Sequence, residues 1–321
     1  MRCSIIVPTY DRLKYLKNCV SSLLSLDYDD DYEIIIVNDA SKDGTMEFAE
    51  NLKNSRIRVL CNEKNLGPAI SRNRGVEAAK YDIVAFIDDD CIAEKSWLRE
   101  LASGFGDEEE NNSEKIGIAE KNCSLSSFIK EGTIVDFVFG RTYYIEKEYK
   151  GYFPERLVNV KNWPGAGNMA FKKNIFKKLG GFDNKFYYYH NEDSELAIRA
   201  VENGFNFKYV ENAKARHQKM DWEVKSLLAS ARNASVWVIL KKKYPKNYKI
   251  FNPPVFSGFI VNGFDYIYFI ILPLLVPFLL IRYFFHKKKD LKIFFAKWPV
   301  YLFLRRYYIY KEAIRNRILF L

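Results

Sequence analysis

Three consecutive acids, Asp88, Asp89 and Asp90, directly follow an apolar run at residues 82–87. If that run is a buried strand, Asp88 and Asp90 project from its carboxyl end. Two carboxylates at this spacing can hold a hard divalent cation and leave open positions for two phosphate oxygens. Magnesium-dependent phosphoryl enzymes share this pattern, and a structural reading also stays open, in which Asp90 caps a helix over 93–101.

Regularly alternating elements surround these acids. Apolar runs predict strands, and apolar residues at helical spacing predict helices between them. The expected strands are 3–8, 33–37, 56–60 and 82–87, and the expected helices are 13–24, 43–53 and 68–80. This order predicts an α/β fold with a mostly parallel sheet covered on both faces. Such sheets bind ligands at the carboxyl ends of their strands, where Asp88 and Asp90 stand.

The later part of the chain is less regular. We expect an acidic loop at 107–114, strands within 133–146, a loop at 187–191, a helix at 192–203 ended by Gly204, and a longer helix from 221 to 243. Tyr244 and Pro245 end that helix. The sequence therefore predicts a soluble α/β domain at 1–243 and a helical, apolar and basic region at 244–321.

Charge is distributed unevenly along the chain. The net charge is +10, and residues 241–321 carry 16 Lys and Arg against three acids. This excess coincides with the segment richest in aromatic and aliphatic residues, which indicates contact with a membrane surface. No zinc-ligand spacing or nucleic-acid-binding module accompanies the charge, so we expect no nucleic-acid partner.

The C-terminal apolar stretch is short. Residues 266–281 are 16 residues without a charge, and the interrupted run at 293–304 is shorter still. A perpendicular spanning helix needs about 20. A re-entrant or interfacial hairpin, or two spans, would keep the basic residues on the cytoplasmic side. The alternative is an aromatic-rich interface of a soluble oligomer.

Cysteine usage and the N-terminus bear on the compartment. The chain has five cysteines with no C-x-x-C pair, and the apolar run before Pro8 is too short for a secretory signal. We expect the domain at 1–243 to lie in the cytosol, on the cytoplasmic face of the cell membrane.

The motifs together resemble the family 2 glycosyltransferases of GT-A fold, over about residues 3–240. The resemblance rests on Ser4–Asp11, Val37–Ser41, Asn65–Gly75 and the Asp88–Asp90 triplet. It implies a donor site for a nucleotide diphosphate sugar and a Mg²⁺ or Mn²⁺ ion. The implied donor residues are Pro8 and Thr9 beside the base, Asp39 at the base or ribose, Arg72 at the base and Asp88 near the ribose, with Asp90 on the metal. Asn38 and Ala40 depart from the usual two acids, Gly and Ser, so the base stays open, with uridine favoured.

The acceptor side carries a second part of the resemblance. Residues 191–199 look like the family's Glu-Asp motif followed on the same helix by a basic residue. Asp193 is then the general base, although a carboxylate at a helix N-terminus also has a purely structural explanation. The resemblance further places Asn168, Glu192 and Arg199 at the acceptor, and His217 near the metal or diphosphate.

The implied activity is inverting transfer of a hexose to a hydroxyl or phosphate of a lipid-linked or membrane-proximal glycan, in polysaccharide or glycolipid biosynthesis. An inverting transfer needs a carboxylate to take the acceptor proton and a cation on the departing diphosphate. A sugar nucleotidyltransferase would more often open with a Gly-rich basic loop, and a dinucleotide dehydrogenase requires a G-x-G-x-x-G motif that is missing here. A non-catalytic, membrane-anchored carbohydrate-binding protein would leave the acidic motifs unexplained.

Overall fold

The computed structural model describes residues 1–106, 134–145, 152, 164–188, 191–219, 223–248, 250, 277, 281 and 290–318. Contacts divide the chain into two compact units. Unit 1 comprises residues 1–144, 161–187 and 192–218, and unit 2 comprises 145–160, 188–191 and 219–321. Every site residue predicted from the sequence belongs to unit 1.

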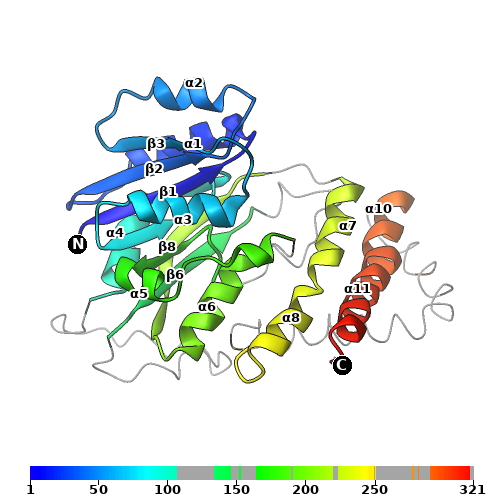
Figure 1. The fold of residues 1–321 in the computed structure, drawn as a ribbon. Helices are drawn as coiled ribbons and strands as arrows, with labels where there is room; N and C mark the ends of the chain where they lie inside the picture. The colour runs from blue at the N-terminus through cyan, green and yellow to red at the C-terminus, as the bar shows by residue number, and fades with distance from the viewer. Residues whose placement is uncertain are drawn as a thin grey trace. The chain divides into compact units, whose positions relative to one another are not determined.

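The described residues of unit 1 form an eight-stranded sheet of order β3-β2-β1-β4-β7-β6-β8-β5 (Figure 1). The parallel half consists of β1 (Cys3–Thr9), β2 (Tyr32–Asn38), β3 (Ile57–Cys61) and β4 (Ile83–Phe86). The other strands are β5 (Cys91–Ala93), β6 (Phe137–Tyr143), β7 (Met169–Lys172) and β8 (Phe207–His217). Because β1, β2 and β4 are parallel, their carboxyl ends meet at one edge of the sheet.

Helices cover both faces of this sheet. Alternate residues of β1, such as Ile5 and Val7, pack in one core with α1 (Leu13–Leu24) and α4 (Trp97–Ser103). The opposite face carries α3 (Pro68–Ala78) and α5 (Lys173–Lys178), whose Phe176 lies 5.4 Å from Phe86 between ring centroids. A Cβ on Gly75 would lie 2.5 Å from Ile6 Cγ2, so glycine is what lets α3 approach the sheet closely.

The four predicted N-terminal strands are confirmed to within about a residue, and they pair in parallel as expected, but the sheet as a whole is less parallel than predicted. The sheet is mixed: β7 runs antiparallel to β4 and β6, and β5 runs antiparallel to β8, while β6 and β8 are parallel. The alternation of strands and helices that signals parallel pairing stops after β4, so sequence periodicity does not predict these pairings.

Two helix predictions also differ from the structure. The helix expected at 43–53 is shortened to α2 (Thr45–Glu50). The long helix expected at 221–243 is two helices, α7 (Val224–Asn233) and α8 (Val236–Lys243). At the break between them, the Ser235 hydroxyl donates to the Arg232 carbonyl at 2.8 Å, a local bond that competes with the helical pattern. The predicted helix at 192–203 is confirmed as α6 (Glu192–Glu202), and a 3₁₀ turn at Asn184–Tyr188 occupies the start of the expected loop.

Unit 2 contains α7, α8, α10 (Leu291–Phe295), a π-helical turn (Ala296–Val300) and α11 (Tyr301–Arg315). Leu227 of α7 packs with Tyr301 and Leu302, and Val238 of α8 packs with Ile309 of α11. The boundary predicted at residue 243 therefore lies between helices that share one core.

None of the helices in the described part of the chain combines the length and the apolar character that crossing a membrane requires. Of the run at 266–281, only residues 277 and 281 are described.

Candidate active site

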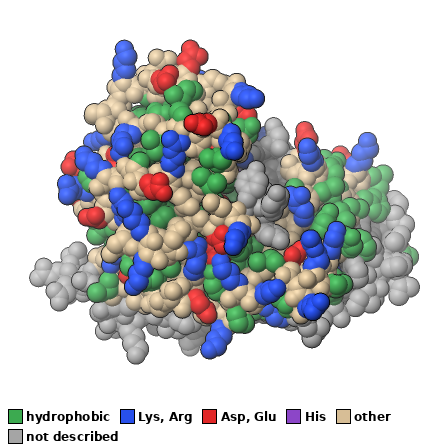
Figure 2. Space-filling view, in the orientation of Figure 1, with side chains coloured by type: hydrophobic (Ala, Val, Ile, Leu, Met, Phe, Trp, Pro, Cys, Tyr) green, Lys and Arg blue, Asp and Glu red, His purple; other side chains and the backbone are tan. Residues whose placement is uncertain are grey.

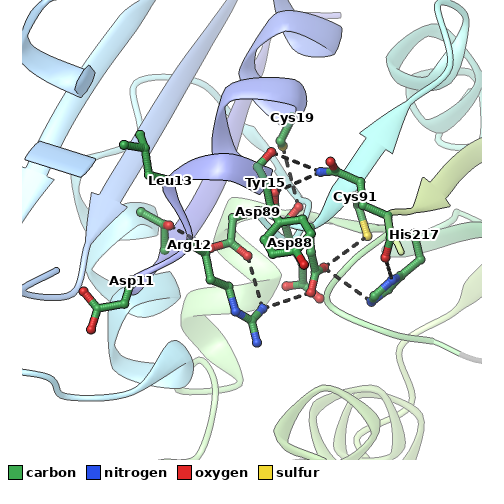
Figure 3. Close-up of polar contacts among 12 residues, drawn as sticks. Asp11, Arg12, Leu13, Tyr15, Cys19, Asp88, Asp89, Cys91 and His217 are labelled. Atoms are coloured by element: carbon green, nitrogen blue, oxygen red, sulfur yellow. Dashed lines mark hydrogen bonds and ion pairs between the residues drawn. The ribbon is translucent and has the colours of Figure 1, made fainter. Parts of the chain in front are cut away.

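Acidic and basic side chains meet where β1 and β4 end (Figure 3). Thr9, the last residue of β1, donates its hydroxyl to Asp89 Oδ2 at 2.7 Å. Arg12, in the loop after β1, places Nη1 at 2.9 Å from Asp90 Oδ2 and 3.3 Å from Asp89 Oδ1. Asp89 and Asp90 are both almost fully buried, whereas the Arg12 side chain is 42% exposed. A cation open to solvent thus faces two buried carboxylates.

The helix-capping role considered for Asp90 is wrong. β5 follows it at once, and α4 begins only at Trp97. Residue Cys91 pairs with His217 of β8, which brings the imidazole to the acid: His217 Nε2 lies 3.5 Å from Asp90 Oδ1. His217 Nδ1 lies 2.8 Å from the Gln218 carbonyl oxygen, which can only accept. In the neutral ring Nδ1 therefore carries the proton and the lone pair of Nε2 faces Asp90.

Asp90 and His217 fit one side of a divalent metal site. Among the described residues, no group of three or more His, Cys, Asp or Glu side chains could hold a metal ion by itself. A metal shared with a substrate diphosphate needs only one or two protein ligands, and a histidine whose other nitrogen is fixed by a carbonyl is a common ligand arrangement. The donor set therefore suits an ion held jointly with a diphosphate, for which Arg12 competes through Asp90.

Burial and charge shift the acid–base equilibria in this cluster. The pKa of Asp89 is raised to about 7: burial is the largest cause and the charge of Asp90 adds to it, whereas Arg12 opposes the rise. Burial lowers the pKa of Arg12, but Asp90 and Asp89 more than offset this, so the guanidinium stays protonated. The Asp89 carboxyl can therefore exchange a proton near neutral pH.

Asp39, after β2, is buried and held by the loop before α3. Its carboxylate accepts from the Leu66 and Gly67 amides at 2.9 and 2.8 Å and from Asn62 Nδ2 at 2.6 Å. Gly67 has a φ of +88°, which favours glycine at this point. Asp39 thus shapes the loop that precedes α3, and its contact with a nucleotide stays a prediction.

The second acidic pair opens α6. Asp193 Oδ2 accepts from the Ala166 amide at 3.1 Å and Oδ1 from the Ser194 amide at 2.6 Å. The pKa of Asp193 is raised to about 7: burial is the largest cause and the Glu192 charge adds to it, whereas the Ala166 amide and Arg72 oppose the rise. A carboxylate with this pKa is suited to accept a proton at neutral pH.

Arg72 of α3 joins the two acidic groups. Its Nη2 lies 2.6 Å from Asp88 Oδ1, and its Nη1 lies 2.6 Å from Glu192 Oε1. The nearby charges of Asp88 and Glu192 outweigh burial and raise the pKa of this guanidinium. The structure thus brings Arg72, Asp88, Glu192 and Asp193 together.

Two predicted acceptor residues have internal partners instead. Asn168 is 1% exposed, accepts from Trp97 Nε1 at 2.8 Å and donates to the Ala213 carbonyl at 2.8 Å. Arg199 contacts Glu195 and the Leu179 and Gly181 carbonyls. These contacts stabilise unit 1, and an acceptor role for either residue stays a prediction, as does a base contact for Pro8, which is buried within β1.

Sequence reasoning gave no role to Arg12, Asp89 or Gln218. Gln218 donates from its backbone to the Asp90 carbonyl at 2.7 Å, and its side chain joins Tyr15 and Asn18 of α1. A cation in the loop after the first strand, opposite an acid triplet, is a signal that could have suggested Arg12. Gln218 depends on the pairing of β5 with β8, which the sequence does not reveal.

Comparison with known proteins indicates the family that the chain resembles. Residues 4–113, which include β1 to β4 and the acid triplet, match the model of glycosyl transferase family 2. Over these residues the chain is similar to glycosyltransferase family 2. Residues 157–221, which hold Asp193 and His217, match a model described as the N-terminal domain of galactosyltransferase.

The curated relatives of this chain carry names that refer to different glycans. Glucosyl-dolichyl phosphate glucuronosyltransferase of Haloferax volcanii is 26% identical over 239 residues, which cover 69% of this chain and 71% of that protein. Chondroitin synthase of Escherichia coli is 26% identical over 269 residues, which cover 77% of this chain but only 39% of the synthase.

Solved structures share the fold at low identity. The mannosyltransferase PcManGT from Pyrobaculum calidifontis, in complex with GDP-Man and Mn²⁺, gives a TM-score of 0.56 at 17% identity, covering 98% of this chain and 86% of that one. S. aureus TarS 1-349 in complex with UDP-GlcNAc gives a TM-score of 0.51 at 17% identity, covering 100% and 93%. The α/β architecture of unit 1 is therefore that of known glycosyltransferases.

Proposed function

We propose that this glycosyltransferase moves a hexose from a nucleotide diphosphate sugar to an acceptor hydroxyl or phosphate, with inversion at the anomeric carbon. The observation that carries the proposal is the placement of Asp193. Its Oδ2 is bonded to the Ala166 amide, and a Cβ on the adjacent Gly167 would lie 3.0 Å from Asp88 Oδ2. The short segment Ala166–Gly167 thus links the proton-accepting carboxylate of Asp193 to Asp88, one of the acids that we place at the sugar donor.

The side chains have distinct tasks in this reaction. Asp193 removes the proton of the acceptor hydroxyl as its oxygen attacks the sugar carbon. Asp90 and His217 would hold a Mg²⁺ or Mn²⁺ ion, and such an ion would supply positive charge for the departing diphosphate. Arg12, exposed beside Asp90, supplies a further positive charge at the same edge. Attack opposite the leaving group, in one displacement, produces the inverted anomer.

Uridine diphosphate is the favoured carrier, and a GDP-sugar is the main competitor. Relatives of known structure bind UDP-GlcNAc in one case and GDP-Man in another, so the comparisons leave both open for this chain. Asn38 and Ala40 lie in the turn beside Asp39, where a base would be read, and differ from the family's usual residues.

A lipid-linked or membrane-proximal glycan is the acceptor we favour, at the cytoplasmic face of the cell membrane. A relative named for a dolichyl phosphate substrate supports this, as does the excess of Lys and Arg after residue 240. Figure 2 shows hydrophobic and basic side chains next to one another on unit 2. On α11 and just before it, the exposed Val300, Tyr307 and Ile314 recur at seven-residue spacing, which places them on one side of the helix.

A donor screen tests the proposed function. The full chain is incubated with UDP-, GDP- and dTDP-sugars and Mn²⁺, and release of the nucleoside diphosphate is measured with and without chelator. We expect turnover of one donor class that chelator abolishes and added Mn²⁺ restores. NMR of the transferred sugar should show the inverted anomer. No turnover of any nucleotide sugar, or retention of configuration, would contradict the proposal.

A further inference from the structure

A buried ionic bridge links the donor-side acids to the start of α6. The Arg72 side chain is 6% exposed and contacts Asp88 and Glu192 at 2.6 Å each, from two different nitrogens. Its guanidinium carbon lies 5.4 Å from the centre of the Phe182 ring, and its Nε is buried without a hydrogen-bond partner. This arginine is therefore committed to two carboxylates on two different elements.

A second connection runs parallel to the first. The middle residue of the segment Gly165–Gly167 contacts Asp193, because the Ala166 amide donates to Oδ2. At the last residue of the segment, a Cβ on Gly167 would meet Asp88 Oδ2 at 3.0 Å. Asp88 thus has one oxygen on Arg72 and the other against the segment that holds Asp193. Both paths join the same acid of the triplet to the first turn of α6.

We propose that Arg72 and Glu192 are positioning residues that hold the base Asp193 in register with the donor-side acid Asp88. This inference rests on the proposed function. The roles expected from the sequence are different: contact with the nucleotide base for Arg72 and contact with the acceptor for Glu192. Since both terminal nitrogens of Arg72 already hold carboxylates, contact with a nucleotide base would compete with the bridge.

The bridge also sets the charge around the base. Glu192 precedes Asp193 on α6, and its negative charge raises the pKa of Asp193. The positive charge of Arg72 on α3 lowers that pKa. Asp88, at the end of β4, shares Arg72 with Glu192 and so limits how much positive charge reaches Asp193. Removing Glu192 or Arg72 should therefore move the pH dependence of the reaction in opposite directions.

The experiment compares Arg72→Gln, Glu192→Gln and the double variant in the full chain. For each, kcat, the KM for donor and the pH midpoint of kcat/KM are measured. Glu192→Gln should lower the midpoint and Arg72→Gln should raise it, each by roughly half a pH unit or more. Each should reduce kcat about tenfold or more, and the double variant should lose less than the product of the single losses. If Arg72→Gln unfolds, Arg72→Lys replaces it, because lysine keeps the positive charge but lacks the two terminal nitrogens that contact Asp88 and Glu192.

The matched control is the surface pair Arg99–Asp27, also an arginine–aspartate contact in unit 1, at 2.5 Å and largely exposed. Arg99→Gln and Asp27→Asn should leave the midpoint and kcat unchanged. An Arg72→Gln variant with raised donor KM but unchanged kcat and midpoint would assign Arg72 to the base and overturn the bridge. If the wild-type chain turned over no donor, the proposed function would fail separately. Additive losses of melting temperature at residues 72 and 192 would then overturn the bridge, and non-additive losses would support it.

Discussion

The environment of Asp193 determines how the reaction should depend on pH. Burial and Glu192 raise the pKa of this carboxyl to about 7, and only the deprotonated form can accept a proton. We expect kcat/KM to fall about tenfold per pH unit below pH ~7 and to level off above it, because kcat/KM reports the free enzyme.

The control for this fall of kcat/KM at low pH, the acidic limb of the profile, is Asp89, whose pKa is also raised to about 7. The limb should survive in Asp89→Asn and disappear in Asp193→Asn. A kcat/KM that stays constant down to about pH 5 would show that no group with a pKa near 7 acts as the base.

Arg12 should compete with the metal for Asp90. Its guanidinium lies 2.9 Å from Asp90 Oδ2. Arg12→Ala therefore removes a cation from a carboxylate that we expect to bind the metal. We expect Mn²⁺ to bind the donor-free protein roughly 3- to 10-fold more tightly in Arg12→Ala, a modest gain because the side chain is partly exposed. Calorimetric titration with Mn²⁺ measures this change.

The comparison variant is Arg141→Ala, which breaks a 2.6 Å contact with Glu211 elsewhere on unit 1. It should leave Mn²⁺ affinity as it is. Unchanged or weaker Mn²⁺ binding in Arg12→Ala would mean that Arg12 assists the metal or acts independently of it.

Single residues with distinctive local motifs could be placed from the sequence. Asp88 and Asp90 follow an apolar run, and Asp193 begins an amphipathic stretch. Their residue types and their sequence neighbours therefore made them candidates for the site. The bridge from Arg72 to Glu192 joins residues 120 positions apart, and no local pattern encodes it. Long-range partners of this kind depend on sheet order, which had to come from the structure.

At the scale of elements, the turn after β2 carries strain. Ala40 has a φ of +63°, a left-handed conformation that glycine adopts far more easily, and Asn38 Oδ1 accepts from the Ser41 amide at 3.0 Å to close the turn. Ala40→Gly should stabilise the fold by about 0.5–1 kcal/mol, because the strain removed exceeds the extra entropy of glycine in the unfolded chain. Chemical denaturation measures this difference.

The control for Ala40→Gly is Ala78→Gly at the end of α3, where glycine should destabilise the protein. Equal destabilisation by both substitutions would show that Ala40 is unstrained.

Strand prediction succeeded where local pattern and pairing agree. β1 to β4 are apolar runs separated by helices, and that order itself implies parallel neighbours. β5 has three residues and β7 has four, too few for a periodic signal, and their antiparallel pairing is set by contacts with distant strands. The helix break at Ser235 was missed because a single serine is compatible with a continuous helix.

At the scale of the whole molecule, unit 2 should attach the enzyme to an anionic membrane surface. Lys311 and Arg315 lie on α11 near the exposed Ile314, and each basic residue near such a surface contributes about 1 kcal/mol. The double variant Lys311→Glu/Arg315→Glu should bind vesicles containing phosphatidylglycerol roughly 10- to 100-fold more weakly, as measured by co-sedimentation.

Lys53→Glu, an exposed charge reversal in unit 1, is the control and should bind like the wild-type chain. Binding by the wild type should weaken in high salt and on vesicles of phosphatidylcholine alone. Wild-type protein that ignores anionic vesicles, or a double variant that binds them normally, would remove α11 from membrane attachment.

The most direct test of the central claim is turnover of Asp193→Asn beside its affinity for donor. We expect kcat to fall by roughly 10²–10⁴, the contribution of a general base, while calorimetry finds donor affinity within about twofold of wild type. A cooperative thermal transition would show that the variant is folded. Near-normal turnover in a folded Asp193→Asn variant would contradict the assignment of this carboxylate as the base.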